Sequence, residues 1–89
     1  PFSLQYLASA LNMSPRHLGR LCKAETGLTP QRYYESQRMR EACRLLAYTG
    51  MTAQQIAYHL GFEDPSYFSR VFQRNLRLSP SAYRSRFEG

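Results

Sequence analysis

The first segment with side chains suited to recognition chemistry lies in the first half of the chain. Arg16, Arg20 and Lys23 are three or four residues apart, so an α-helix would place them on one face. Gly19 falls on the same face. A glycine inside a helix costs up to about 1 kcal/mol relative to alanine. Close approach of DNA and packing against a neighbouring helix are the two reasons to keep it.

A second segment, in the other half of the chain, repeats the spacing with different side chains. Arginine can donate two hydrogen bonds to guanine, glutamine pairs with adenine, and serine bonds to either. These are the side chains that read base edges in a major groove. The predicted outward stripe consists of Ser66, Ser69, Arg70 and Gln73, with Arg74 beside it.

The elements that must position these stripes are pairs of amphipathic helices. Apolar residues recur at the i, i+3, i+4 and i+7 spacing of one buried helical face. They do so both in the segment before each stripe and on the opposite side of the stripe's own helix. The predicted inner positions are Leu4, Leu7, Ala8, Leu11, Leu18, Leu21 and Cys22 in the first half, and Ala53, Ile56, Ala57, Leu60, Phe68, Val71 and Phe72 in the second.

Each stripe-bearing helix has a clear start. Ser14 followed by Pro15, and Asp64 followed by Pro65, each combine a capping residue with proline at the first helical position. The helices before them also have caps, Ser3 and Thr52. Gln55 would complete a capping box with Thr52.

The two halves are copies of one pattern. Residues 3–30 align with residues 52–80, so that Ser3 matches Thr52, Leu18 matches Phe68 and Arg20 matches Arg70. A helix, a short break and a second helix with a basic outer face is the helix-turn-helix arrangement. We therefore expect an all-α protein with a first helix-turn-helix unit over residues 3–28 and a second over residues 52–89, which includes a C-terminal helix.

A long linker helix is predicted between the units, over residues 29–49. Thr29 can cap it, Pro30 can begin it, and Gly50 is the expected stop after Tyr48. About 18 helical residues span roughly 27 Å, and major-groove faces recur about every 34 Å. We expect both reading helices to enter successive grooves on one side of a duplex. The predicted inner face of the linker helix consists of Met39, Ala42, Cys43 and Leu46.

Some basic side chains outside the reading stripes are phosphate candidates. Arg38 and Arg40 on the linker helix are two of them. Glu35 and Glu41, at helical spacing, would partly pair the arginines of this helix, and the alternative is that some of these arginines are merely solvated surface residues. His17, beside Arg16, is either another phosphate contact or an ordinary polar-face residue. The remaining flank or phosphate candidates are Lys23, Gln73 and Arg74.

Composition bounds the other functions. The 89 residues suit one domain, and twelve basic residues, all arginine except Lys23, against six acidic ones give a net charge of +6. That excess suits a phosphate backbone or an acidic surface. No apolar run is long enough for a membrane span and no leader opens the sequence, so we expect a soluble, intracellular chain.

Cofactor and enzyme chemistry lack sequence support. His17 and His59 match no zinc spacing with Cys22 and Cys43, which we expect to be free thiols on apolar faces. No catalytic triad spacing and no phosphate-cradling glycine loop occurs. We expect neither a metal, nor a cofactor, nor an enzyme.

The spaced pattern resembles the DNA-binding domain of AraC/XylS-type bacterial transcription regulators over essentially the whole chain. In the second half the matching residues are Ala57-x-x-x-Gly61-Phe62, Tyr67-Phe68-Ser69-Arg70-x-Phe72 and Ser79-Pro80-x-x-Tyr83-Arg84. In the first half and the linker they are Leu7-Ala8, Ser14, Leu18, Arg20-Leu21, Gly27, Pro30, Tyr33, Arg38-Met39, Ala42 and Leu45-Leu46.

The resemblance implies one AraC-type DNA-binding domain over residues 1–89, which binds promoter DNA and activates transcription by contacting RNA polymerase. It also implies a bacterial, cytoplasmic, nucleoid-associated protein, with an upstream domain for effector binding or dimerisation. Phosphates would meet the backbone around Ser3 and Thr52. The base-contacting positions it implies are Arg16, Gly19 and Arg20 on the first reading helix, and Pro65, Ser66, Ser69 and Arg70 on the second.

Three features depart from the family pattern. Cys22 stands where phenylalanine is usual, which shrinks the first core. Arg77 stands where the second copy would carry the counterpart of Gly27, so it must accept a positive φ or change the helix ending. The sequence begins at Pro1 without the family's additional first helix, so we expect a fragment.

Two classes of function remain open from the sequence. The first is sequence-specific binding of duplex DNA, favoured by Arg20 and Arg70 at equivalent places. The second is a protein-interaction module that uses its helix-turn-helix units to dock on RNA polymerase, with weak or one-unit DNA contact.

Overall fold

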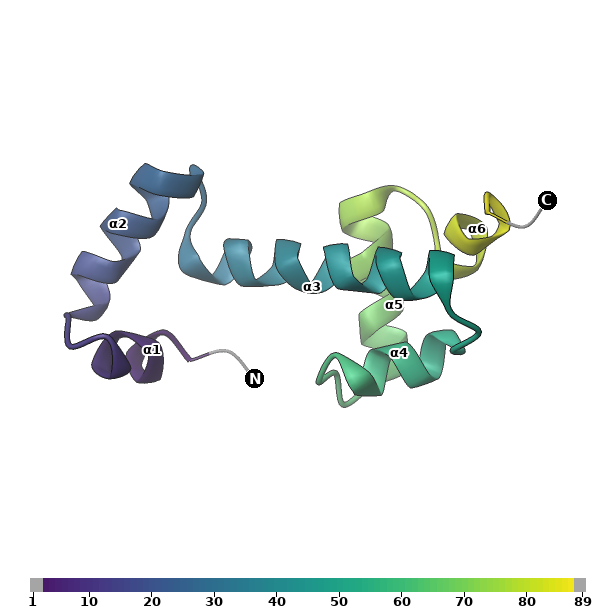
Figure 1. Cartoon of the computed structure of the whole chain (residues 1–89), viewed down its shortest axis with the longest axis horizontal. Helices are drawn as coiled ribbons and strands as arrows, with labels where there is room; N and C mark the ends of the chain where they lie inside the picture. Colours follow the sequence, from purple (N-terminus) through teal and green to yellow (C-terminus); the bar gives the residue numbers. More distant parts are fainter. Residues whose placement is uncertain (1–2, 88–89) are drawn as a thin grey trace. The chain divides into compact units, whose positions relative to one another are not determined.

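The structure is a computed structural model that describes residues 3–87, and every regular element in that range is a helix (Figure 1). The all-α prediction is confirmed. The two ends of the predicted 1–89 domain lie outside the described residues. The helices are α1 (Leu4–Ala10), α2 (Pro15–Thr26), α3 (Pro30–Tyr48), α4 (Ala53–His59), α5 (Pro65–Leu76) and α6 (Pro80–Ser85).

The chain divides into two compact units. Unit 1 is Pro1–Gln37 and holds α1, α2 and the start of α3; unit 2 is Arg38–Gly89 and holds the rest of α3 with α4, α5 and α6. The predicted linker helix therefore belongs partly to each unit. The expectation that both reading helices face one side of a duplex stays a prediction. Along residues 3–87, none of the helices combines the length and apolarity needed to cross a bilayer.

The helix caps form as the sequence predicts. The Oγ of Ser3 accepts a hydrogen bond from Tyr6 N at 3.2 Å, and the Oγ of Ser14 accepts one from His17 N at 3.1 Å. The capping box is complete, because Gln55 N donates to Thr52 Oγ1 and Thr52 N donates to Gln55 Oε1. These bonds satisfy amides that a helix start leaves without partners.

The turn between the paired helices is the same in both units. Asn12 and Gly61 adopt left-handed backbone angles, with φ of 58° and 90°. The amide after each turns back onto the preceding helix, with Met13 N donating to Ala8 O at 3.0 Å and Phe62 N to Ala57 O at 2.9 Å. Asparagine tolerates this conformation better than most residues. One turn geometry therefore sets both helix pairs.

The core of unit 2 joins four helices. Phe68 and Phe72 of α5 are fully buried, and Phe72 meets Tyr83 of α6 edge-on at 5.7 Å between ring centroids. A hydrogen bond with Cys43 raises the pKa of the Tyr83 phenol. Both cysteines are free thiols. The buried cluster is Met39, Ala42, Leu45, Leu46, Ile56, Ala57, Phe62, Phe68, Val71 and Phe72.

The core of unit 1 is smaller than the apolar spacing predicts. Ala8 and Leu18 are buried, but Leu7, Leu11 and Leu21 are 39%, 52% and 42% exposed. The prediction that these three leucines are buried is wrong. Two short helices cover each other along one narrow line, because residues on a helix radiate around its axis and only those that face the partner lose contact with water.

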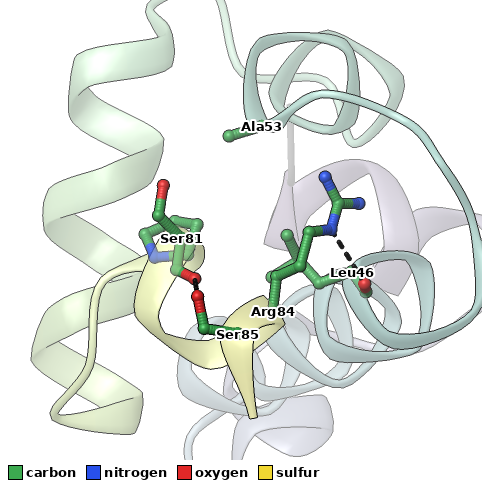
Figure 2. A pocket seen from close by; sticks show the side chains of 6 residues that line it. Leu46, Ala53, Ser81, Arg84 and Ser85 are labelled. Atoms are coloured by element: carbon green, nitrogen blue, oxygen red, sulfur yellow. Dashed lines mark hydrogen bonds between the residues drawn. The ribbon is translucent and has the colours of Figure 1, made fainter. Parts of the chain in front are cut away.

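The end of α3 differs from the prediction that Gly50 stops the helix. Positive φ occurs at Gly27 and Gly61 but not at Gly50. Instead, Arg84 reaches from α6, and its Nε donates to Leu46 O at 3.1 Å (Figure 2). Its Nη2 donates to Thr49 O, also at 3.1 Å. The Thr49 hydroxyl also donates to Leu45 O. A guanidinium and a threonine thus satisfy the last carbonyls, which a left-handed glycine would otherwise help to satisfy.

Arg84 also walls a small hollow in unit 2. This hollow, of about 210 Å³, lies against α6 and the end of α3. Figure 2 shows Arg84 on one side and the Ser85 hydroxyl donating to Ser81 O on the other. Its lining residues are Leu46, Ala53, Pro80, Ser81, Arg84 and Ser85.

Replacement of Arg84 by leucine should lower the free energy of unfolding of unit 2. Two hydrogen bonds from a charged donor are lost and two carbonyls lose a partner, so we expect a loss of roughly 1.5–3 kcal/mol. Urea denaturation followed by circular dichroism measures it. Arg86→Leu, at an exposed neighbouring position, is the matched control and should change stability little. Equal effects of the two variants would contradict the anchoring role of Arg84.

Candidate nucleic-acid interface

The outward stripe of α2 lies where the sequence predicts it. Arg16, His17, Arg20 and Lys23 are exposed, on the side away from buried Leu18. Since Arg16 and Arg20 are one helical turn apart, their guanidinium groups can reach a common ligand.

Gly19 lies in open space. A Cβ built on this residue would meet no atom within 4 Å outside its own helix backbone and chain neighbours. Packing against a neighbouring helix, one of the two reasons for a glycine here, therefore does not operate. The close approach of a ligand is left as the physical reason to keep it.

The stripe of α5 carries the second set of predicted base contacts. Ser66, Arg70, Gln73 and Arg74 are exposed, and Ser69 is half-buried. Pro65, at the first helical position, is half-buried as well. The buried face of the same helix is Phe68, Val71 and Phe72, so the outward direction of the stripe is fixed by the core.

The reading helices differ at their starts. Ser14 presents a neutral hydroxyl at the start of α2, but Asp64 presents a carboxylate at the start of α5, where its Oδ1 accepts from Ser66 N at 2.9 Å. A carboxylate stabilises a helix N-terminus through the helix dipole and repels a nearby phosphate. The start of α2 is therefore the more favourable of the two for an anion.

A series of side-chain contacts through two tilted aromatic rings links Arg70 to Arg38 of α3. The Arg70 guanidinium carbon lies 5.7 Å from the centroid of the Tyr67 ring, within the range of a cation–π contact. The Tyr67 ring lies 6.0 Å from Phe62. The guanidinium carbon of Arg38, on α3, lies 3.9 Å from the centroid of the Phe62 ring.

The Arg38 guanidinium is therefore engaged within the protein, whereas a phosphate contact would extend into solvent. Its Nη1 donates to Leu60 O at 3.2 Å, so it holds the last turn of α4 as well as the Phe62 ring. Half-buried and engaged with the turn, Arg38 positions the second helix-turn-helix unit. This placement argues against its predicted role at a phosphate, because the guanidinium would have to leave the ring and the carbonyl.

The other phosphate candidates stay predictions. Arg40 is exposed on α3. The hydroxyl oxygens of Ser3 and Thr52 already accept hydrogen bonds from their own helices, so any phosphate would meet the neighbouring backbone. Arg44 is paired, with its Nη2 2.7 Å from Glu41 Oε2, and this hydrogen bond lowers the pKa of the Glu41 carboxyl.

The sequence and the fold of this chain are similar to those of known helix-turn-helix proteins. A family described as a helix-turn-helix domain matches residues 7–86. A crystal structure from Chromobacterium violaceum, of a regulator described by its AraC-type DNA-binding domain, superposes with a TM-score of 0.90 at 30% identity, over 98% of this chain and 78% of that one. The chain belongs to the AraC/XylS family.

Two further relatives of this AraC-type domain are informative. The DNA-binding domain of AdpA, crystallised in complex with a target DNA, superposes with a TM-score of 0.90 at 32% identity, over 98% of this chain and 78% of that one. The transcriptional activator RhaS of Escherichia coli O157:H7 is 40% identical over 83 residues. Those residues are 93% of this chain and 30% of RhaS, so the chain spans about a third of that relative.

The structure adds two residues, Tyr67 and Arg77, to the surroundings of the α5 stripe. Tyr67 belongs to the family motif, and its i, i+3 spacing from Arg70 is the sequence signal for the side-chain contact that the structure shows. Arg77 departs from the family pattern at the end of α5. It lines a surface hollow with Arg70, Gln73 and Arg74, and its spacing from Arg70 and Gln73 carries that information.

Alanine at position 19 should stabilise unit 1. The added Cβ meets open space, and alanine is favoured over glycine inside a helix by up to about 1 kcal/mol. Gly27→Ala is the matched opposite case, since Gly27 has φ of 77° and should lose about 1 kcal/mol or more. Urea denaturation, with hydrogen exchange at α2 amides to localise the effect, measures both. A destabilised Gly19→Ala variant would contradict the open environment.

Proposed function

We propose that this AraC-type domain binds promoter DNA sequence-specifically and that α2 and α5 each enter a major groove. The observation that carries the proposal is the pair of equivalent exposed arginines, Arg20 and Arg70. They lie on helices that each begin with a capping side chain and a proline and that follow the same turn. A domain that reads a duplex twice needs such a repeated outward group. The similarity to a domain crystallised on its target DNA supports the proposal.

The residues divide by role in this proposal. Arginines read guanine, serines read several bases, and the Gly19 backbone allows close approach. Because the outward side chains of the two helices differ, the site they read is an asymmetric one. Base contacts are Arg16, Gly19, Arg20, Pro65, Ser66, Ser69 and Arg70, and phosphate or flank contacts are Ser3, His17, Lys23, Arg40, Thr52, Gln73 and Arg74.

The partners and setting are proposed for a longer protein. The relative RhaS is named a transcriptional activator, which favours activation through contact with RNA polymerase. Oligomerisation would come from a segment outside this chain. A bacterial regulator of this kind works in the cytoplasm, on nucleoid DNA. These roles require no cofactor and no catalytic step.

The proposal is tested with a duplex that the chain itself selects from a random library. Titration at physiological salt should show binding to the selected duplex that is roughly a thousandfold or more tighter than to a scrambled duplex of the same composition. Equal affinity for the two duplexes would overturn sequence-specific reading. It would favour instead an interaction module that docks on polymerase.

Loss of either reading arginine should remove discrimination at particular base pairs. If Arg20 and Arg70 each bond to a guanine, alanine at either position should cost about 1–3 kcal/mol of discrimination there. Titration of each variant against single-base substitutions of the selected duplex measures the penalty position by position.

Arg44→Ala is the control, because it removes the same charge from an exposed arginine that is paired with Glu41. It should leave the base preferences unchanged. A uniform penalty in the Arg20 or Arg70 variant would make that arginine a phosphate contact. An effect of Arg70→Ala without one of Arg20→Ala would indicate that a single unit engages the DNA.

A further inference from the structure

Arg77 occupies a backbone position that suits glycine. It caps the end of α5 with φ of 65° and ψ of 15°, and its amide donates to Gln73 O at 2.8 Å. In unit 1 the same cap is Gly27, with φ of 77° and an amide bond of 2.8 Å to Lys23 O. Glycine enters this left-handed region freely, but an arginine Cβ crowds the following carbonyl. The helix ending alone would be better served by glycine.

The arginine side chain adds charge to a surface that is already basic. Arg77 is exposed and lines a hollow of about 490 Å³ together with Arg70, Gln73 and Arg74. Arg70, Gln73 and Arg74 share one stripe of α5, and the hollow brings Arg77, which follows the last residue of the helix, beside them. Arg77 therefore holds a strained backbone position that glycine would relieve, and its side chain shares one hollow with two further arginines, which suits an anion.

We propose that this hollow is an anion-binding site for a phosphate of the DNA backbone and that Arg77 is one of its donors. The proposal rests on the DNA-binding function above. Arginine presents several donors in a planar fork that matches a phosphate. Arg70 and Gln73, which line the hollow, also belong to the outward stripe of α5. A duplex that meets this stripe therefore brings its backbone to the same surface, which favours phosphate over the carboxylates of a protein partner.

Arg77→Gly tests the site because folding and binding should respond in different directions. The folded protein should have a thermal midpoint at least as high as wild type, because the left-handed strain is removed. Affinity for DNA should fall roughly three- to tenfold at 0.1 M salt, and the slope of log affinity against log salt should become shallower by about 0.9. The loss should be equal on the selected and the scrambled duplex, because a phosphate contact carries no sequence information.

Two comparisons make the result specific. Arg44→Ala removes one positive charge of unit 2 outside the hollow, and it should keep the wild-type salt slope. Arg77→Gln removes the charge without introducing glycine, and it should reproduce the shallower slope even if the glycine variant proved unstable.

A wild-type salt slope in the Arg77→Gln variant would overturn the proposal. So would wild-type DNA binding by Arg77→Gly combined with weaker binding to purified RNA polymerase, since the hollow would then take carboxylates. Failure of sequence-specific reading is a separate result. It appears as equal wild-type affinity for both duplexes, while the slope change in the Arg77 variants would persist.

Discussion

Burial of the inner face of α5 is the constraint on which the second half of the molecule depends. A helix presents successive residues at a fixed rotation, so burying one stripe decides which residues face outward. Phe68 and Phe72 are fully buried, and Phe72 meets Tyr83 of α6. With those rings in place, Arg70 and Gln73 have no freedom to turn inward. The proposed reading surface is thus a consequence of the aromatic core rather than of any interaction among the reading residues themselves.

The two units use the same scaffold but differ in the side chains that hold the outward helix in place. In unit 2 a series of contacts runs from Arg38 through Phe62, in the turn between α4 and α5, and Tyr67 to Arg70. Among the described residues of unit 1, the buried apolar side chains are Ala8 and Leu18, which restrain α2 less strongly. By these contacts, α5 is the more preorganised of the two outward helices. Preorganised contacts lose less entropy when a ligand binds.

The sequence predicts what depends on local chemistry. Caps, proline starts, helix bounds and outward stripes follow from residue types at short spacing, and the structure confirms them. The sequence does not predict the side-chain contacts that form between segments far apart in the chain. Arg84 caps α3 from 38 residues away, and Arg38 bonds to Leu60 O across 22 residues. Periodicity also overstates burial, because it shows that Leu7 and its neighbours share a face and not that anything covers it.

Both units are proposed to bind the same duplex, one through α2 and the other through α5. Nuclear magnetic resonance titration of the isotope-labelled chain with a selected duplex tests it most directly. We expect the largest changes in amide chemical shift at residues 16–23 and 66–73, together, at one chain per duplex. Changes confined to one of these helices, or centred on the opposite faces, would contradict it.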